Sequence, residues 1–116
     1  MTEHNIGDGN VEIILDGEPL ILRPSLKAAL VLSNGQGGIP VMVQRCINLE
    51  MDAITSIISH GLGVWSKDIP EKVYNTGLFT LSGKCIHFLN ILANGGRPLL
   101  SEEDKEESNS PLEHTN

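Results

Sequence analysis

Two cysteines and two histidines are the residues whose types are suited to hold a metal ion: Cys46, His60, Cys85 and His87. A structural zinc site takes four such ligands, which usually come as closely spaced pairs. The sequence has neither a CxxC nor an HxxxH pair, and both cysteines fall on the apolar stripes of predicted helices. A buried thiol there packs as a small hydrophobic group. We therefore predict two free thiols, no metal and no cofactor.

A glycine-rich stretch, NGQGGIP at residues 34–40, has the composition of a loop that holds a phosphate at the start of a helix. The segment before it has a helical pattern, however, and no Gly-Lys-Ser or Gly-Lys-Thr follows. A turn between two helices is therefore the favoured interpretation. A nucleophile elbow, an HExxH motif and an EF-hand loop are also missing from the sequence, so no catalytic residue is predicted and the chain is not expected to be an enzyme.

The first structural element that the sequence predicts is a β-hairpin. Apolar runs at residues 11–15 and 19–22 flank Asp16-Gly17-Glu18, and an Asp-Gly between two such runs is a strong hairpin signal. Pro24 then prevents further strand pairing at its own nitrogen. Ser25 stands where a helix N-cap belongs, ahead of Leu26, Ala29 and Leu30 at helical spacing.

Helical patterns fill the rest of the chain up to a Gly-Gly-Arg-Pro stop at residues 95–98. The predicted helices cover residues 25–34, 40–47, 51–60, 69–76 and 79–93. The third has the clearest amphipathic pattern, with Met51, Ile54, Ile57 and Ile58 on one face. The expected fold class is mostly α with an N-terminal β-hairpin, an α+β arrangement in a small domain of four to five helices.

The charge is concentrated at one end of the chain. The net charge is −7, and residues 101–116 hold six acidic residues and one lysine. That segment is too polar to offset its ordering entropy, so we expect a disordered acidic tail at 101–116, a single domain at 11–100 and a flexible N-terminus at 1–10. A nearly neutral body with few aromatic residues is a poor partner for nucleic acid.

The sequence shows no signal peptide and no apolar run long enough to cross a membrane, which favours a cytoplasmic location with reduced thiols. The last helix is unusually apolar: its hydrophobic residues cover an arc of about 240°, whereas a surface helix needs little more than about 100°. Either this is the central helix of the core, or part of the arc contacts a partner. In the second case Ile86 and Ile91, at opposite margins of the arc, are the predicted partner-binding residues, together with the uncovered face of the hairpin.

The order of these signals resembles a small family of phage and gene-transfer-agent tail proteins, which are described as tail tube proteins and as tail assembly chaperones. The stretches that carry the resemblance are LDGEPLILRPSLKAAL, GQGG, MDAITSIISHGLG and GLFTLSGKCIHFLNIL. It covers about residues 11–98. This chain has Ser33-Asn34 where members of the family carry a glutamate near the end of the first helix.

The resemblance implies a non-enzymatic assembly protein of the host-cell cytoplasm. Its implied partners are the tape-measure protein, whose apolar helices such a chaperone shields, and the tail tube subunits. The alternative is a structural tube or adaptor component that stays in the virion tail. A single short hairpin favours the chaperone, because a tube subunit needs long strands. The oligomeric state stays open, a homo-oligomer included.

Overall fold

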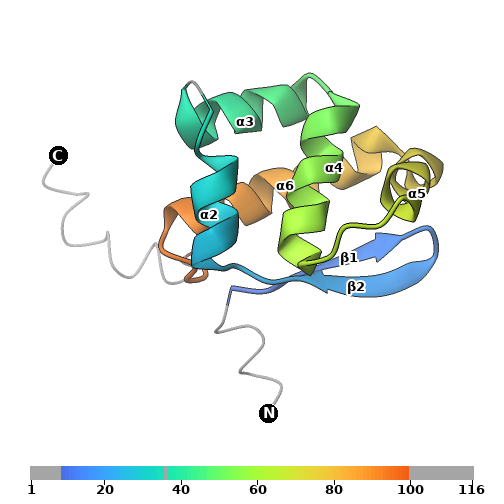
Figure 1. The fold of residues 1–116 in the computed structure, drawn as a ribbon, viewed down its shortest axis with the longest axis horizontal. Coiled ribbons are helices and arrows are strands. Elements are labelled where there is room, and N and C mark those ends of the chain that lie inside the picture. Colours follow the sequence, from blue (N-terminus) through green and yellow to red (C-terminus); the bar gives the residue numbers. More distant parts are fainter. Residues whose placement is uncertain (1–8, 36, 100–116) are drawn as a thin grey trace, which may run out of the picture.

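The structure, a computed structural model, describes residues 9–35 and 37–99. In these ranges a two-stranded antiparallel sheet is followed by five helices, and Figure 1 shows the helices gathered on one side of the hairpin. The expected class, mostly α with an N-terminal β-hairpin, is confirmed. None of the helices in the described ranges is both long and apolar enough to cross a membrane.

The hairpin pairs β1 (Val11–Leu15) with β2 (Glu18–Leu22). Asp16 and Gly17 form the turn with φ of 52° and 85°, the left-handed geometry that Asp-Gly favours in a two-residue hairpin loop. The turn is also held from outside, since the Asp16 N–H donates to Thr76 Oγ1 at 2.6 Å. Alternate residues of β1 are buried, so one face of the hairpin packs on the core and the other faces solvent.

Helix α2 (Leu26–Leu32) begins at the predicted cap, because the Ser25 hydroxyl accepts the Ala28 N–H at 3.0 Å. The helical spacing located the helix correctly. Ala28 and Leu32 point into the core, while Leu26 and Leu30 point outward.

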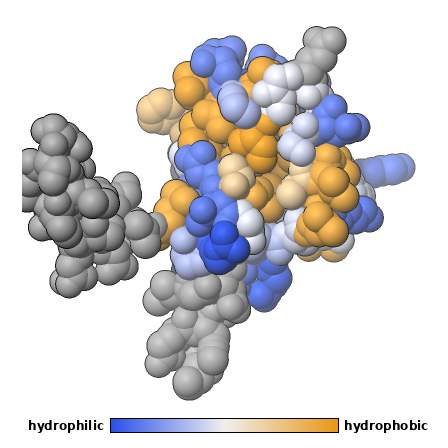
Figure 2. Space-filling view, turned by 90° about the vertical axis from the view of Figure 1, so that its left-hand side faces the viewer, coloured by the Kyte–Doolittle hydropathy of each residue, from blue (hydrophilic) through white to orange (hydrophobic). Residues whose placement is uncertain are grey.

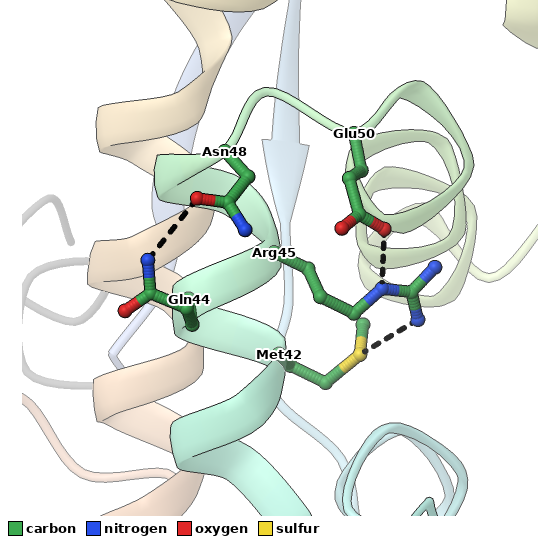
Figure 3. Close-up of polar contacts among 5 residues, drawn as sticks. All are labelled: Met42, Gln44, Arg45, Asn48 and Glu50. Carbon is green, nitrogen blue, oxygen red and sulfur yellow. Dashed lines mark hydrogen bonds and ion pairs between the residues drawn. The ribbon is translucent and has the colours of Figure 1, made fainter.

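Helices α3 (Gly38–Ile47) and α4 (Met51–Leu62) are joined by a tight turn, shown in Figure 3. Leu49 has a φ of 60°, which reverses the chain direction. Arg45 Nε donates to Glu50 Oε1 at 2.7 Å and closes the turn from outside. Helix α3 begins at Gly38, two residues before the predicted start at Pro40.

Helices α4 and α5 (Asp68–Thr76) pack against each other and against opposite strands of the hairpin. As predicted, Ile54, Ile57 and Ile58 of α4 are fully buried. The helix continues past the predicted end, because Gly61 lies inside it and Gly63, with a φ of 75°, ends it. A Cβ on Gly61 would lie 2.8 Å from Leu22 Cβ, so only glycine lets α4 approach β2 this closely.

Helix α6 (Leu78–Ala93) is the central helix, in contact with β1 and with α2, α3, α4 and α5. Most of its apolar arc is therefore core, which was the first of the two interpretations of that arc. Its buried residues are Leu81, Cys85, Phe88, Leu89, Ile91 and Leu92.

The body of the protein begins slightly earlier than predicted. Gly9 is buried and Asn10 is half-buried, so these two residues pack with the domain although they fall in the segment 1–10 that was expected to be flexible. The prediction for residues 1–8 and the prediction of a disordered tail at 101–116 lie outside the described residues.

Candidate interaction surface

The two predicted partner-binding residues of α6 have different environments. Ile91 is only 1% exposed, so its prediction as a surface residue is wrong. The turn that follows α6 and the segment before β1 cover it: a Cβ on Gly9 would lie 3.0 Å from Ile91 Cγ2 and 2.5 Å from the carbonyl oxygen of Gly96. Helical spacing alone could not show this, because the covering residues lie outside the helix.

Ile86 is half-buried and packs against the core, so only the edge of its side chain faces solvent. The most exposed apolar side chain of α6 is Phe79 in the first turn, at 82% exposed. The exposed apolar surface of α6 is therefore smaller than the apolar arc suggests, and it is confined to the start and one flank of the helix.

The cysteines and histidines do not come together as a site. Cys46 of α3 and Cys85 of α6 are both free and fully buried, as the apolar stripes predicted. The hydrogen bond with Cys46, together with burial, raises the pKa of Cys85 far above the usual range of a thiol, so Cys85 stays protonated. His87 is exposed on the opposite side of α6 from Cys85.

No group of three or more histidine, cysteine, aspartate or glutamate side chains suited to a metal ion occurs among residues 9–35 and 37–99. His60 is engaged locally: its Nδ1 lies 2.9 Å from the Ser56 carbonyl oxygen, and its ring meets Trp65 edge-on at 4.6 Å. The Ser56 hydroxyl oxygen lies 3.5 Å from the same nitrogen, and together these contacts fix the end of α4.

The strongest departure from an ordinary surface is on α2. Leu26 and Leu30, one turn apart, are 77% and 60% exposed, and Val31 beside them is also exposed. We call these three residues the α2 face. Figure 2 views the end of the molecule where α2 and the start of α3 lie in Figure 1, and apolar surface is prominent there. A contiguous exposed apolar patch of this kind marks a candidate interaction site.

A groove of about 430 Å³ adjoins the α2 face. It runs between the first turn of α2 and the end of α6, so that Leu26 borders both the groove and the open surface. Its lining residues are Pro24, Ser25, Leu26, Ala29, Leu92, Gly95 and Gly96. The α2 face and this groove together form a ridge beside a hollow, the shape into which an apolar segment of another chain packs.

A second hollow of about 500 Å³ lies between the hairpin and the first half of α6. Ile14, Pro19 and Ile21 line it from the hairpin, and Lys84 lines it from α6. Ile14 is 62% exposed, so the predicted uncovered face of the hairpin is indeed apolar and open. That it binds a partner stays a prediction.

Comparisons of the chain with family models, with curated proteins and with solved structures find no match. The surface is therefore judged on its own geometry. Sequence reasoning missed the α2 face, although a signal was present. Residues 26–32, LKAALVL, contain one charged residue and no other polar side chain, so this short helix cannot bury all of its apolar residues against one body.

Proposed function

We propose that this protein is a non-enzymatic tail assembly chaperone of a phage or phage-like particle. It binds an apolar helical segment of the tape-measure protein and helps tube subunits assemble around it. The single observation that carries the proposal is the α2 face: two leucines and a valine are held toward solvent on a short helix whose cap and buried residues fix its orientation. The resemblance of the sequence supplies the identity of the partner.

The binding mode follows from the spacing of the exposed side chains. Leu26 and Leu30 lie one turn apart, so they form a short apolar ridge parallel to the axis of α2. An amphipathic helix of the partner packs against such a ridge with residues at the same spacing. Burying two leucine side chains that are now largely exposed contributes a few kcal/mol, about 1.5–3 kcal/mol for each when burial is complete.

The alternative function is a structural tube or adaptor component of the tail. The two strands that the structure describes are five residues each, which supports the chaperone because a tube wall needs longer paired strands. Mass spectrometry of purified particles separates the two. A chaperone is absent from mature particles, and recovery of this chain at many copies per tail would establish the structural role instead.

The binding surface itself is tested by coexpression with the tape-measure protein and pull-down. Leu26→Glu and Leu30→Glu place a charge in a surface that becomes dry on binding, so we expect each to abolish most of the complex while the circular dichroism spectrum is retained. The matched control is Tyr74→Glu, which places the same charge on the exposed surface of α5. If the leucine variants capture the partner as well as Tyr74→Glu does, the α2 face is not the binding surface.

A further inference from the structure

The two cysteines meet inside the core. Cys46 lies in the last turn of α3 and Cys85 in the middle of α6, and these helices pack against each other (Figure 3, where α6 is the pale orange helix beside α3). Both side chains are fully buried, and the Cys85 thiol donates a hydrogen bond to the Cys46 sulfur. The two sulfur atoms are therefore in direct contact, and a short movement of the side chains brings them to the distance of about 2.0 Å that a disulfide requires.

The surroundings of the two thiols suit a disulfide better than a metal ion. Cys46 and Cys85 are the only two cysteines in the sequence, so each has one possible disulfide partner within the molecule. In the part of the chain that the structure describes, neither belongs to a group of three or more side chains that could hold a metal ion. Both are members of the apolar cluster of the core. A disulfide adds no hydrogen-bond donor there, so the core can contain it without an unpaired polar group.

The two thiols are chemically unequal. The hydrogen bond from Cys85 lowers the pKa of the Cys46 thiol, and the positive charge of Arg45 acts in the same direction, against burial and the negative charge of Glu50. The same hydrogen bond keeps the proton on Cys85. Because the thiolate is the nucleophilic form of cysteine, Cys46 is the thiol that reacts first, and Cys85 is placed to attack the product.

We propose that Cys46 and Cys85 are a redox pair that closes to a disulfide between α3 and α6 when the protein meets a hydroperoxide. The Cys46 sulfur attacks the terminal peroxide oxygen, the O–O bond breaks, and the other oxygen leaves with the Cys46 proton, so that Cys46 becomes a sulfenic acid. The Cys85 sulfur then attacks the Cys46 sulfur, and the sulfenic hydroxyl leaves as water with the Cys85 proton. Two thiols lose two electrons, and one peroxide gains them.

Burial makes this reaction depend on local opening of the fold. Neither thiol is accessible while the core is closed, so a small hydroperoxide reaches Cys46 only when the end of α3 moves. The chain after Cys46 forms the tight turn to α4, in which the Leu49 N–H donates to the Cys46 carbonyl oxygen at 2.9 Å. Leu49 has a φ of 60°, a conformation that a leucine rarely adopts. We therefore expect the core to open at this turn and the pair to oxidise more slowly than an exposed thiol.

The disulfide ties α3 to the central helix. It closes a loop of the chain that contains α4 and α5, and this loop restricts the unfolded chain more than the folded one. The second cysteine also protects the first, because a sulfenic acid that becomes a disulfide is not oxidised further to the irreversible sulfinic acid. Neither cysteine lies on the α2 face, so the redox pair and the proposed function can fail independently.

The proposal is tested by treating the full chain with excess hydrogen peroxide in native buffer, followed by intact-mass measurement, thiol titration and thermal melts. We expect a monomer whose mass is lower by about 2 Da, with both thiols lost and both recovered after dithiothreitol. The thermal midpoint of the oxidised chain should be higher by at least about 5 °C, because the link restricts the unfolded chain. An equal or lower midpoint would contradict a disulfide that the native packing contains.

Two single variants, checked for folding by circular dichroism, test the roles of the two thiols. In Cys85→Ala the resolving thiol is missing, so dimedone should trap a sulfenic acid on Cys46. In Cys46→Ala the remaining Cys85 should react at least about tenfold more slowly than Cys46 does in Cys85→Ala. Equal rates in the two variants would contradict these roles.

The wild type alone can overturn the proposal, whether or not the variants fold. Retention of both thiols in excess peroxide would show that the pair does not oxidise in the folded protein. A gain of oxygen atoms without a disulfide would show that the two thiols react separately. Dimers linked by a disulfide would show that the cysteines react only after the core has come apart.

Discussion

Helices α2 and α6 are both rich in leucine and isoleucine, yet they use these residues in opposite ways. In α6 the apolar side chains are buried on several sides because four other helices and β1 pack around it. In α2 only Ala28 and Leu32 are buried, and Leu26 and Leu30 face water. The comparison shows that the burial of an apolar helix depends on how many elements pack around it and not on its composition alone. The helix with excess apolar surface is the short peripheral one.

The largest difference in stability should appear when a charged residue is introduced at a buried position of α6 and at an exposed position of α2. Leu89→Glu in α6 places a carboxylate in the centre of the core, so we expect a loss of about 5 kcal/mol or more, comparable with the whole free energy of unfolding. Leu30→Glu in α2 should change that free energy by less than about 0.5 kcal/mol. Circular dichroism and denaturant melts measure both. Equal destabilisation would mean that Leu30 is part of the core.

The next largest difference in stability should come from a substitution that leaves a cavity in the core. Ile58 of α4 is fully buried, and Ile58→Ala should lower the free energy of unfolding by about 2–5 kcal/mol because the removed methyl groups leave a void. Val31→Ala on the α2 face is the control, and it should be neutral or slightly stabilising since alanine is the better helix former. A loss below about 1 kcal/mol for Ile58→Ala, measured in urea, would contradict the burial of α4.

Two glycines inside helices extend the comparison. Substitution by alanine should lower the free energy of unfolding at one of them and raise it at the other. Gly61→Ala introduces a Cβ against Leu22, so we expect a loss of about 1–3 kcal/mol from overpacking. Gly83 lies on the solvent side of α6 with no atom within 4 Å of an added Cβ, so Gly83→Ala should stabilise by about 0.5–1 kcal/mol. Thermal melts of the two variants measure both changes. If the two midpoints move in the same direction, either the close contact at Gly61 or the open space at Gly83 is contradicted.

Local chemistry explains which parts of the fold could be predicted from the sequence. The Asp16-Gly17 turn and the Ser25 cap each depend on backbone geometry that few residues satisfy, so the hairpin and the start of α2 were placed correctly. The periodic isoleucines of α4 identified a buried face because only one face of that helix is apolar.

The orientation of α2 and the cover over Ile91 could not be predicted because they depend on contacts between distant segments. In α2 every position except Lys27 is apolar, so periodicity does not choose a face. Ile91 is covered by Gly9 and Gly96, which are glycines and leave no hydrophobic signal. The sequence therefore placed the candidate surface on α6, whereas the structure buries Ile91 and exposes Leu26 and Leu30 of α2.

The smallest expected effect comes from removal of the acidic segment. Truncation after Leu100 removes the acidic segment 101–116 and should leave α6 and its neighbours unchanged. Contacts of exposed charges contribute about 0–1 kcal/mol and less at high salt, so the thermal midpoint should move by no more than a few degrees at low salt and by less in about 0.5 M NaCl. A drop of many degrees that persists at high salt would show that residues 101–116 pack on the body through apolar contacts.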